Sequence, residues 1–398
     1  MPNVRQIILR PKRVAAIASR HPWVMAPSIV EPVDQPEAGE SVDLVLPDGK
    51  WLARGIYNPH SHIRIRLYSW DQSVDVDDDL FGARIDQAID LRKQLSDCHP
   101  QSAQRMIFSE ADQLSGLIVD RYANYLVVHV TARAIADRLP AVLNKLEARL
   151  TPTAIFVQVD EKTAAMEGVS PRQEFVFGTA PTAPVEIEEH GIRLLVDLDG
   201  GQKTGYFLDQ RDNRRAAADW VRPGAKVLDV CCYLGGFSLA IARWSQARHV
   251  LGIDSSQRAL EHARKNAVLN GLTNIDFESG DFFDTLGAYV EQKKQFDVVV
   301  LDPPRMAGSR DQMAQALRAY HRLNLLATRL LPPGGILVTC SCSGRVSRSD
   351  FRDVLLGVSR QSGREIQILE QRGAASDHPS LVTVPETDYL KCLICRVL

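Results

Sequence analysis

The sequence lacks an apolar run long enough to cross a bilayer, and its first residues lack the basic, apolar, small-residue order of a secretion signal. It also lacks a metal-ligand or disulfide framework, because its seven cysteines are odd in number and scattered. These absences predict a protein of the reducing cytoplasm with no metal and no membrane anchor. One CxxC, at Cys392 and Cys395, has no second pair, so we interpret it as strand packing.

No excess of either charge is present, since 47 Lys and Arg against 49 Asp and Glu give a net charge of -2. A chain coated in positive charge is excluded, but a local basic stripe for nucleic acid is not. The first 30 residues hold five Lys or Arg and no acid, whereas residues 71–79 hold five aspartates. The charge is therefore segregated along the chain.

A chain of 398 residues without internal repeats or low-complexity segments predicts two or three globular domains. Residues 1–70 are β-rich, with a strand–turn–strand over 42–57 and a short helix expected over 13–19. The alternation in Ile63–Tyr68 places Arg64 and Arg66 on one face of a half-exposed strand. Two arginines there suit a phosphate backbone, although a solvated strand face explains them equally well.

Residues 81–184 show no catalytic constellation. The pattern predicts helices over 81–95 and 136–150, and strands over 125–130 and 154–159. Residues 112–122 have the small and acidic side chains of a turn between strands, and the Thr-Ala-Pro repeat at 179–184 indicates a boundary.

From Val185 onward, strands and helices alternate regularly, which is typical of a parallel α/β sheet. Ligands of such sheets lie beyond the carboxyl ends of the strands. The first strand end, Asp229–Phe237, opens a helix with two glycines, which allow a close backbone approach to an anionic group. Acids follow the next two strands at Asp254 and Asp281, and we interpret the three ends as an adenosine-binding edge. The alternative is that both acids only cap helices.

The fourth strand ends in Asp302, Pro303, Pro304 and Arg305, a stiff turn that exposes carbonyl groups to a planar substrate. This motif resembles the Asp-Pro-Pro-Tyr type of S-adenosylmethionine-dependent methyltransferases that act on bases. The resemblance implies a class I, Rossmann-like methyltransferase in the C-terminal half, with S-adenosylmethionine as cofactor.

The fifth strand, from Gly335, ends in two cysteines, Cys340 and Cys342. C5 of a pyrimidine is a poor nucleophile, so its methylation needs a thiolate that first adds to C6. Periodicity does not separate the two cysteines, because residues two apart in a strand face the same way. Position favours Cys342, which lies beyond the apolar run, while packing is the alternative for either thiol.

The whole chain resembles the large-subunit ribosomal RNA cytosine-5 methyltransferase I family. The resemblance rests on His21–Trp23, Lys50–Gly55, Glu188–Gly191, Lys203–Arg211 and Asp377–Pro379. It implies an α/β architecture with a β-rich PUA RNA-binding domain at 1–77, an α+β EEHG-type domain at 78–184 and the methyltransferase domain at 185–398.

The same resemblance implies the residue roles. Cys342 in Ser-Cys-Ser-Gly is the nucleophile, and Asp302 holds the N3/N4 edge of the base. The implied target is cytosine 1962 of 23S ribosomal RNA, naked or in an assembling large subunit, and the oligomeric state is left open. The resemblance implies Phe207, Asp209 and Gln210 as cofactor residues, and they join the strand-end residues expected to bind the cofactor, which are Asp229, Tyr233, Gly235, Gly236, Phe237, Asp254, Asp281 and Asp302. The implied RNA contacts are Pro303, Pro304, Arg305, Arg64 and Arg66.

Two alternatives remain. The same fold could methylate uridine C5, a ring nitrogen or a small molecule, or the chain could be an RNA-binding assembly factor with a vestigial pocket. An enzyme acting on a ring nitrogen has no use for Cys342, whereas uridine C5 chemistry would use it in the same way. The intact cofactor motifs count against the assembly factor.

Overall fold

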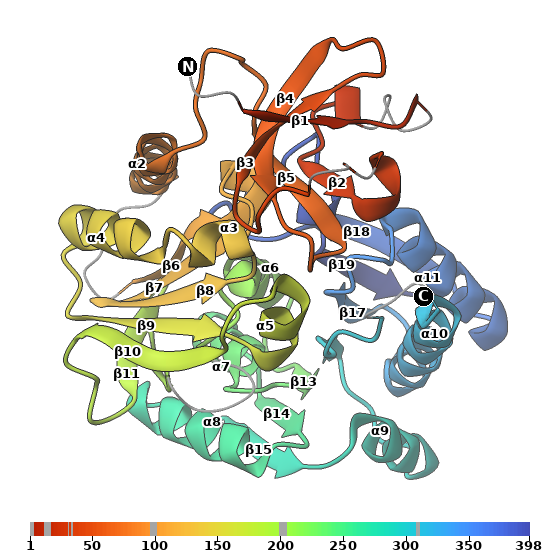
Figure 1. Cartoon of the computed structure of the whole chain (residues 1–398). Helices are drawn as coiled ribbons and strands as arrows, with labels where there is room; N and C mark the ends of the chain where they lie inside the picture. Colours follow the sequence, from red (N-terminus) through yellow and green to blue (C-terminus); the bar gives the residue numbers. More distant parts are fainter. Residues whose placement is uncertain are drawn as a thin grey trace. The chain divides into compact units, whose positions relative to one another are not determined.

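The computed structural model describes residues 4–11, 17–30, 32, 35–95, 102–198, 205–307 and 311–398. The chain forms two compact units (Figure 1). The first contains Met1–Val185, Asp197–Gly205 and Asp377–Thr387. The second contains Glu186–Val196, Tyr206–Ser376 and Asp388–Leu398.

The first unit begins with a five-stranded sheet in the order β1-β3-β4-β5-β2. Its strands are β1 (Arg5–Ile8), β2 (Trp23–Met25), β3 (Ser41–Val45), β4 (Trp51–Tyr57) and β5 (Ile63–Ser69). The expected strand–turn–strand is confirmed, since β3 and β4 pair antiparallel across the turn. The helix expected over 13–19 lies mostly outside the described residues.

A second sheet of this unit has the order β10-β9-β8-β7-β6. Its strands are β6 (Ala103–Phe108), β7 (Leu117–Tyr122), β8 (Tyr125–Val130), β9 (Ala154–Val159) and β10 (Arg172–Gly178), with helices α2 (Asp78–Leu95), α3 (Arg133–Ala136), α4 (Leu139–Leu150) and α5 (Glu161–Glu167). The prediction of a turn over 112–122 is wrong for its second half, which is β7. Apolar side chains of Leu117 and Val119 enter the core there and override the polar turn signal.

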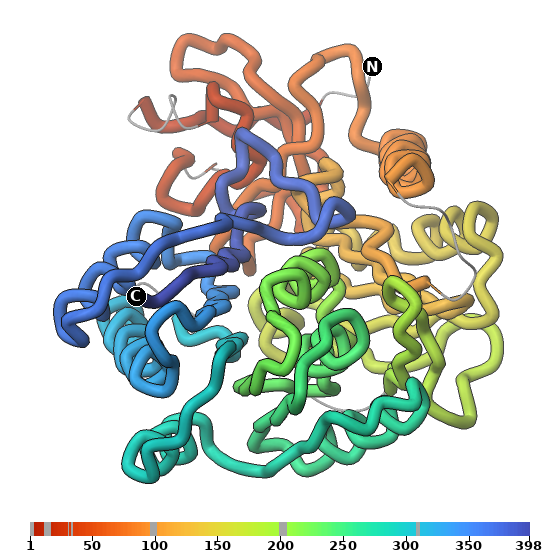
Figure 2. Tube along the Cα trace, turned by 180° about the vertical axis from the view of Figure 1, so that it is seen from behind, coloured from red at the N-terminus to blue at the C-terminus, as the bar shows by residue number. Residues whose placement is uncertain are grey.

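The segment Asp377–Thr387 belongs to this first unit although it comes late in the sequence. Figure 2 shows this blue segment beside the red-to-orange part of the chain. Its backbone and side chains join residues far away in sequence: Asp377 O accepts from Arg92, and Glu386 lies 3.2 Å from His21. The first unit is thus built from discontinuous parts of the chain.

The second unit contains a seven-stranded sheet in the order β15-β14-β13-β16-β17-β19-β18. Its strands are β13 (Lys226–Val230), β14 (His249–Asp254), β15 (Ile275–Ser279), β16 (Val298–Leu301), β17 (Gly335–Ser341), β18 (Ile366–Arg372) and β19 (Lys391–Val397). The first five are mutually parallel, and β19 pairs antiparallel with both β17 and β18. The predicted parallel sheet is confirmed, and the antiparallel strands β19 and β18 extend it at one edge.

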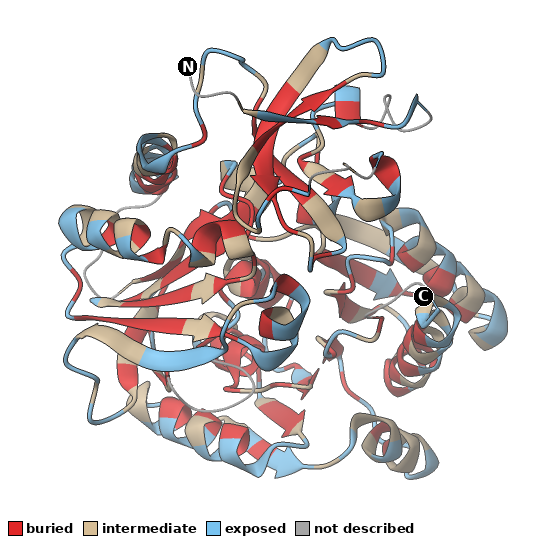
Figure 3. Cartoon of the chain, in the orientation of Figure 1, coloured by how far each residue is buried: buried red, intermediate tan, exposed pale blue. Residues whose placement is uncertain are grey.

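Helices connect these strands and bury apolar side chains against the sheet. They are α6 (Arg211–Asp219), α7 (Gly236–Trp244), α8 (Gln257–Leu269), α9 (Phe282–Glu291), α10 (Met313–Leu330) and α11 (Arg348–Ser362), and a hairpin of β11 (Val185–Glu189) and β12 (Ile192–Val196) precedes them. Figure 3 shows the two-faced character of α8, whose buried residues include Leu260 and Ala263. Among the described residues, no helix combines the length and apolar character that crossing a membrane requires.

Cys392 and Cys395 are both buried on β19 and belong to two different core clusters. Because they are three apart in a strand, they point to opposite faces of the sheet. The interpretation of this CxxC as strand packing is confirmed.

Candidate active site

The site is formed where the parallel strands of the second unit end. β13 and β16 are neighbours, with Val230 opposite Leu301, and the N–H of Asp302 donates to Val230 O at 3.3 Å. The carboxyl ends of these strands share one edge of the sheet, so the loops after them converge.

The loop after β13 is held in an unusual backbone conformation. Cys231 and Tyr233 have positive φ angles of 64° and 52°, which side chains other than glycine rarely adopt. Two bonds from the next strand fix the loop: Tyr233 N donates to Asp254 Oδ2 and Cys232 N to Ile253 O, both at 2.9 Å. Such strain at a strand end is typical of a ligand-binding loop.

The two acids after β14 and β15 behave differently. Asp254 anchors the β13 loop, and the cap of α8 is Ser256, whose hydroxyl accepts from Ala259 N. Asp281 does cap α9, because its carboxylate accepts from Phe283 N and Asp284 N at 2.8 and 3.1 Å. The alternative of a simple cap thus describes the geometry of Asp281 and not that of Asp254, and the cofactor role of both stays a prediction.

Gly236, at the start of α7, is packed against two side chains. A Cβ on this residue would lie 2.4 Å from Tyr206 Oη and 2.6 Å from Arg214 Nε, so a larger residue would not fit. Arg214 is buried, pairs with Glu189 Oε2 at 2.7 Å and donates to Phe207 O at 2.6 Å. Its guanidinium lies 4.0 Å from the Tyr206 ring centre, a cation–π distance.

Sequence reasoning missed Arg214. Its partner Glu189 stands in the Glu-Glu-His-Gly stretch, which carries the resemblance but had no assigned role. The hairpin of β11 and β12 therefore supplies the counter-ion beneath the loop that opens α7. Only the spacing of Arg214 after the Lys203–Arg211 stretch could have suggested this contact.

Three aspartates gather beside that loop. Asp229 and Asp209 are buried, and each has one carboxylate oxygen without a hydrogen-bond partner among the described residues. Their other oxygens are bonded, Asp229 to the Ser238 hydroxyl at 2.6 Å and Asp209 to the Tyr389 hydroxyl at 2.5 Å. We call Asp209, Asp229 and Asp302 the acid cluster.

Asp302 is partly buried and accepts from Gln210 Nε2 at 2.9 Å. Burial raises the pKa of its carboxyl group to about 7, and the negative charge of Asp209 adds to this shift. Burial likewise raises the pKa of Asp229 to about 6. Carboxylates with these properties favour a cationic ligand or protons, although the charge of Arg214 partly opposes theirs.

The two cysteines of the fifth strand are clearly different. Cys340 lies inside β17, is fully buried and faces Cys392 across the antiparallel pair. Cys342 follows the end of β17 and is partly exposed, with its sulfur 3.9 Å from Pro303 O. Burial raises the pKa of the Cys342 thiol to about 12, and the charges of Asp302 and Asp209 act in the same direction.

The Cys342 loop is tied to the turn after β16. Ser343 Oγ accepts from Met306 N and Ala307 N at 3.2 Å each, and the Tyr320 hydroxyl lies 3.0 Å from Ser341 Oγ and from Ser343 Oγ. These bonds fix Cys342 beside the Asp-Pro-Pro turn. In that turn Pro303 is buried, while Pro304 and Arg305 are exposed.

Phe207, another predicted cofactor residue, keeps 40% of its surface exposed and packs edge-on against Tyr233, with 5.3 Å between ring centres. Gln210 lies between Asp302 and Asn213, whose amide donates to Gln210 Oε1 at 2.7 Å. Lys203 and Thr204 of the same stretch lie outside the described residues.

The expectation that Arg64 and Arg66 share a half-exposed strand face is wrong for Arg66. Only 8% of Arg66 is exposed, and its guanidinium lies 3.3 Å from Glu167 and 3.5 Å from Glu110. Arg64 is partly exposed and donates to the carbonyl of Pro59. Alternation alone could not reveal that α5 and η3 (Ser109–Asp112) cover this face with acids.

Comparison with known proteins supports the two-part organisation. A family model described as a PUA-like domain matches residues 7–70, and one described as a methyltransferase domain matches residues 222–371. Ribosomal RNA large subunit methyltransferase I of Citrobacter koseri is 38% identical over 395 residues, which is 99% of each chain. Its namesake in Aeromonas hydrophila is 39% identical over 387 residues, 96% of this chain and 97% of the relative.

Solved structures share the fold. A chain from Streptococcus mutans described as a SAM-dependent methyltransferase matches with a TM-score of 0.85 and 17% identity, covering 99% of this chain and 100% of its own. A methyltransferase complexed with SAH matches with a TM-score of 0.86 and 17% identity, at the same coverage. The predicted Rossmann-like methyltransferase fold with a PUA-like N-terminal domain is confirmed.

The cofactor of this fold is S-adenosylmethionine, and the acid cluster fits it. Its methionine part carries two positive groups, a sulfonium and an ammonium, and one carboxylate. The unpartnered oxygens of Asp209 and Asp229 offer acceptors for positive groups. The helix start at Gly236 offers backbone N–H groups to a carboxylate.

Proposed function

The chain belongs to the ribosomal RNA large subunit methyltransferase I family, and from this premise we propose that it methylates C5 of a cytosine in 23S ribosomal RNA. By resemblance the target is cytosine 1962. The single observation that carries the chemistry is the partly exposed Cys342 at the end of β17, with its sulfur 3.9 Å from Pro303 O.

A cysteine at this place answers a chemical need, because C5 of cytosine does not attack a methyl donor unaided. The Cys342 thiolate forms a bond to C6, and the electron pair of the C5–C6 double bond then attacks the methyl group. When bound, the cofactor supplies this methyl group on a positively charged sulfur. A base next removes the C5 proton, the double bond reforms, and the Cys342 sulfur leaves.

We propose that Asp302 holds the N3/N4 edge of the cytosine. With a pKa of about 7, raised by burial, its carboxyl group is partly protonated at neutral pH. A protonated carboxyl donates to the N3 lone pair of cytosine and accepts from the N4 amino group. Uracil presents a donor at N3 and an acceptor at O4, which a protonated carboxyl can match by exchanging the roles of its two oxygens, so the choice between the two bases is decided by the product analysis below.

We propose that the turn of Pro304 and Arg305, which is exposed, contacts the base and its neighbours. The base must leave its stack to reach Cys342, so we expect single-stranded or flipped RNA. We further propose that residues 1–77 form the RNA-binding domain, 78–184 the middle domain and 185–398 the methyltransferase domain. Arg66 is left out of the RNA surface because its guanidinium is buried among acids.

The function is tested with labelled S-adenosylmethionine and 23S ribosomal RNA from a strain that lacks this modification. Digestion to nucleosides should place the label in 5-methylcytidine. Label in 5-methyluridine would favour the second candidate, which uses the same thiolate addition. Label in a ring-nitrogen product would refute the role of Cys342 altogether.

A further inference from the structure

Lys391, the first residue of β19, is a buried lysine that the chemistry above does not use. Only 1% of it is exposed, and its Nζ donates to Ser343 O and to Tyr389 O at 2.7 Å each. Among the described residues, no carboxylate lies within ion-pair distance of this ammonium. Burying an ammonium without a counter-ion is unfavourable, and burial lowers the pKa of Lys391 to about 8. Because this burial is unfavourable, the presence of a lysine at this position requires an explanation.

The position of Lys391 supplies one. In the antiparallel pair of β17 and β19, Lys391 is opposite Ser341, and its Nζ is bonded to the carbonyl of Ser343. Lys391 therefore contacts the chain on both sides of Cys342. Two residues earlier, the Tyr389 hydroxyl bonds to Asp209 at 2.5 Å, so this short stretch joins the acid cluster to the nucleophile loop.

The environment of Cys342 otherwise opposes a thiolate. The partial burial of the thiol opposes its ionisation most, and the negative charges of Asp302 and Asp209 act in the same direction. A thiol attacks as its thiolate, so a nearby positive charge is needed when the bond to C6 forms. The positive charge of Lys391 acts on Cys342 in this direction.

We propose that Lys391 is a positioning residue for Cys342, whose ammonium holds the Ser341–Ser343 loop and places positive charge beside the attacking thiolate. This rests on the proposed function, in which Cys342 is the nucleophile. The thiol proton leaves to solvent before the bond to C6 forms, and Lys391 keeps its own proton throughout. Lys391 thus stabilises the negatively charged sulfur of Cys342 and neither donates nor accepts a proton in the reaction.

A different role is a purely mechanical clamp, in which the two bonds to carbonyls matter and the charge does not. The charged groups that act on Lys391 or Cys342 are Asp302, Asp209, Asp388, Asp350 and Arg348. The two roles differ in how the reactivity of the thiol depends on pH, and this reactivity can be measured without RNA or cofactor.

The test is the rate of alkylation of Cys342 by iodoacetamide between pH 6 and 10, read from its own peptide by mass spectrometry. In the wild-type chain, the logarithm of the rate should rise with pH and then flatten near pH 8, where Lys391 loses its charge. Lys391→Arg, which keeps a charge over this range, should remove the flattening. Lys391→Met should lower the rate at pH 7 by about tenfold, about one unit of thiol pKa.

Controls separate charge from folding and from the proposed function. The peptide that contains Cys231 should be alkylated equally in all three proteins, and their affinity for S-adenosylmethionine should agree within about threefold. Methyl transfer by Lys391→Met should lose kcat with an unchanged KM for the cofactor, and Lys391→Arg should recover much of it.

Two results overturn the proposal. In the first, the alkylation rate of Cys342 in the wild-type chain rises with pH without flattening, and Lys391→Arg gives the same profile. This result does not depend on whether Lys391→Met folds. The other is an equal loss of Cys342 reactivity in the Arg and Met variants, which would assign the clamp role. If instead the labelled product is not 5-methylcytidine, the proposed function fails while the alkylation result stands by itself.

Discussion

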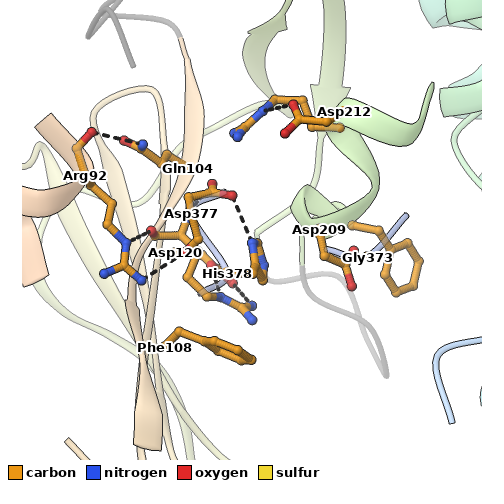
Figure 4. A network of polar contacts seen from close by, with 12 residues as sticks. Arg92, Gln104, Phe108, Asp120, Asp209, Asp212, Gly373, Asp377 and His378 are labelled. Atoms are coloured by element: carbon orange, nitrogen blue, oxygen red, sulfur yellow. Dashed lines mark hydrogen bonds and ion pairs between the residues drawn. The ribbon is translucent and has the colours of Figure 1, made fainter. Parts of the chain in front are cut away.

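The buried charges of the two units are satisfied in different ways. In the first unit, Arg92 is fully buried and donates to Asp377 O (Figure 4). Arg92 also lies 2.6 Å from Asp112, and Arg105 forms two 2.8 Å bonds with Asp120. In the second unit, Asp209 and Asp229 each keep a buried oxygen without a partner among the described residues.

This difference supports our proposal that the network of the first unit is a scaffold, here called the scaffold cluster, and that the acid cluster binds the cofactor. In the first unit each of these guanidinium groups meets a carboxylate, and Asp377 adds bonds to Arg105 N and His378 Nδ1 at 3.0 and 2.9 Å. Such a network fixes the structure and offers little to a ligand. The acid cluster is incomplete until a positive group arrives, which is expected of a site that binds a sulfonium cofactor.

The largest effect is expected at the nucleophile. Cys342→Ala should lower methyl transfer by about a thousandfold or more, because the path through the C6 adduct is lost. Cys340→Ala should keep activity within about threefold and lose about 1 kcal/mol of unfolding free energy through a small cavity. Single-turnover rates and denaturant unfolding of both variants measure this, and the reverse ranking would move the role to Cys340.

Substitutions in the scaffold cluster of the first unit should lower the stability of the protein and leave its affinity for the cofactor unchanged. Arg92→Met leaves Asp112 buried without its partner, so the first unit should lose about 3–5 kcal/mol of unfolding free energy. Adding Asp112→Leu should recover part of that loss, while the affinity for S-adenosylmethionine stays unchanged in both. Denaturant unfolding and calorimetric titration test this, and weaker cofactor binding would contradict the distinction between the clusters.

Substitutions in the acid cluster should lower the affinity for the cofactor and should not lower the stability of the protein. Asp302→Asn removes one carboxylate of the acid cluster, which we propose to face the positive cofactor, so the affinity for S-adenosylmethionine should fall by about tenfold. The stability of the free protein should not fall, because a buried charge is removed. Titration calorimetry and denaturant unfolding at pH 8 check both expectations, and a loss of stability with unchanged affinity would contradict them.

The pH dependence follows from the raised pKa values of Asp302 and Asp229, about 7 and about 6. The folded free protein holds these protons more tightly than the unfolded chain, so the stabilisation is present at acidic pH and is lost as pH rises through 6 to 7. Over the same window the affinity for S-adenosylmethionine should rise, because the ionised cluster attracts it. An affinity that falls from pH 5 to pH 8 would contradict this account.

The smallest effect is expected at the exposed turn. Arg305→Ala should raise the KM for RNA by a few-fold and reduce its dependence on salt by about one unit of slope, with little change in kcat. Arg352→Ala, an exposed arginine of α11, is the matched control and should change neither value. Equal effects of both variants would show that Arg305 has no particular contact.

Much of the second unit could be predicted from its sequence, because local patterns determine it. Apolar runs predicted the parallel strands, and the positions of Asp229 and Asp302 at the carboxyl ends of two of those runs indicated that both residues lie at one edge of the sheet. Cys342 stood out because it lies just beyond its strand. These features depend on short stretches, which propensity and periodicity describe well.

The contacts that could not be predicted join residues far apart in sequence. Arg92 and Asp377 are 285 residues apart, and Arg66 meets an acid 101 residues later. The roles of Arg214, Glu189 and Lys391 likewise depend on partners that only the folded chain brings near. Burial decides the behaviour of a charged residue, and periodicity does not report what covers a strand face.

The most direct test of the central claim uses RNA that contains 5-fluorocytidine at the target. Fluorine at C5 cannot leave as the proton does, so the enzyme should remain joined through Cys342 to the methylated base. We predict a denaturant-resistant protein–RNA complex that requires S-adenosylmethionine, forms with Cys340→Ala and is absent with Cys342→Ala. A complex that persists in Cys342→Ala, or no complex with an active wild-type enzyme, would contradict the account.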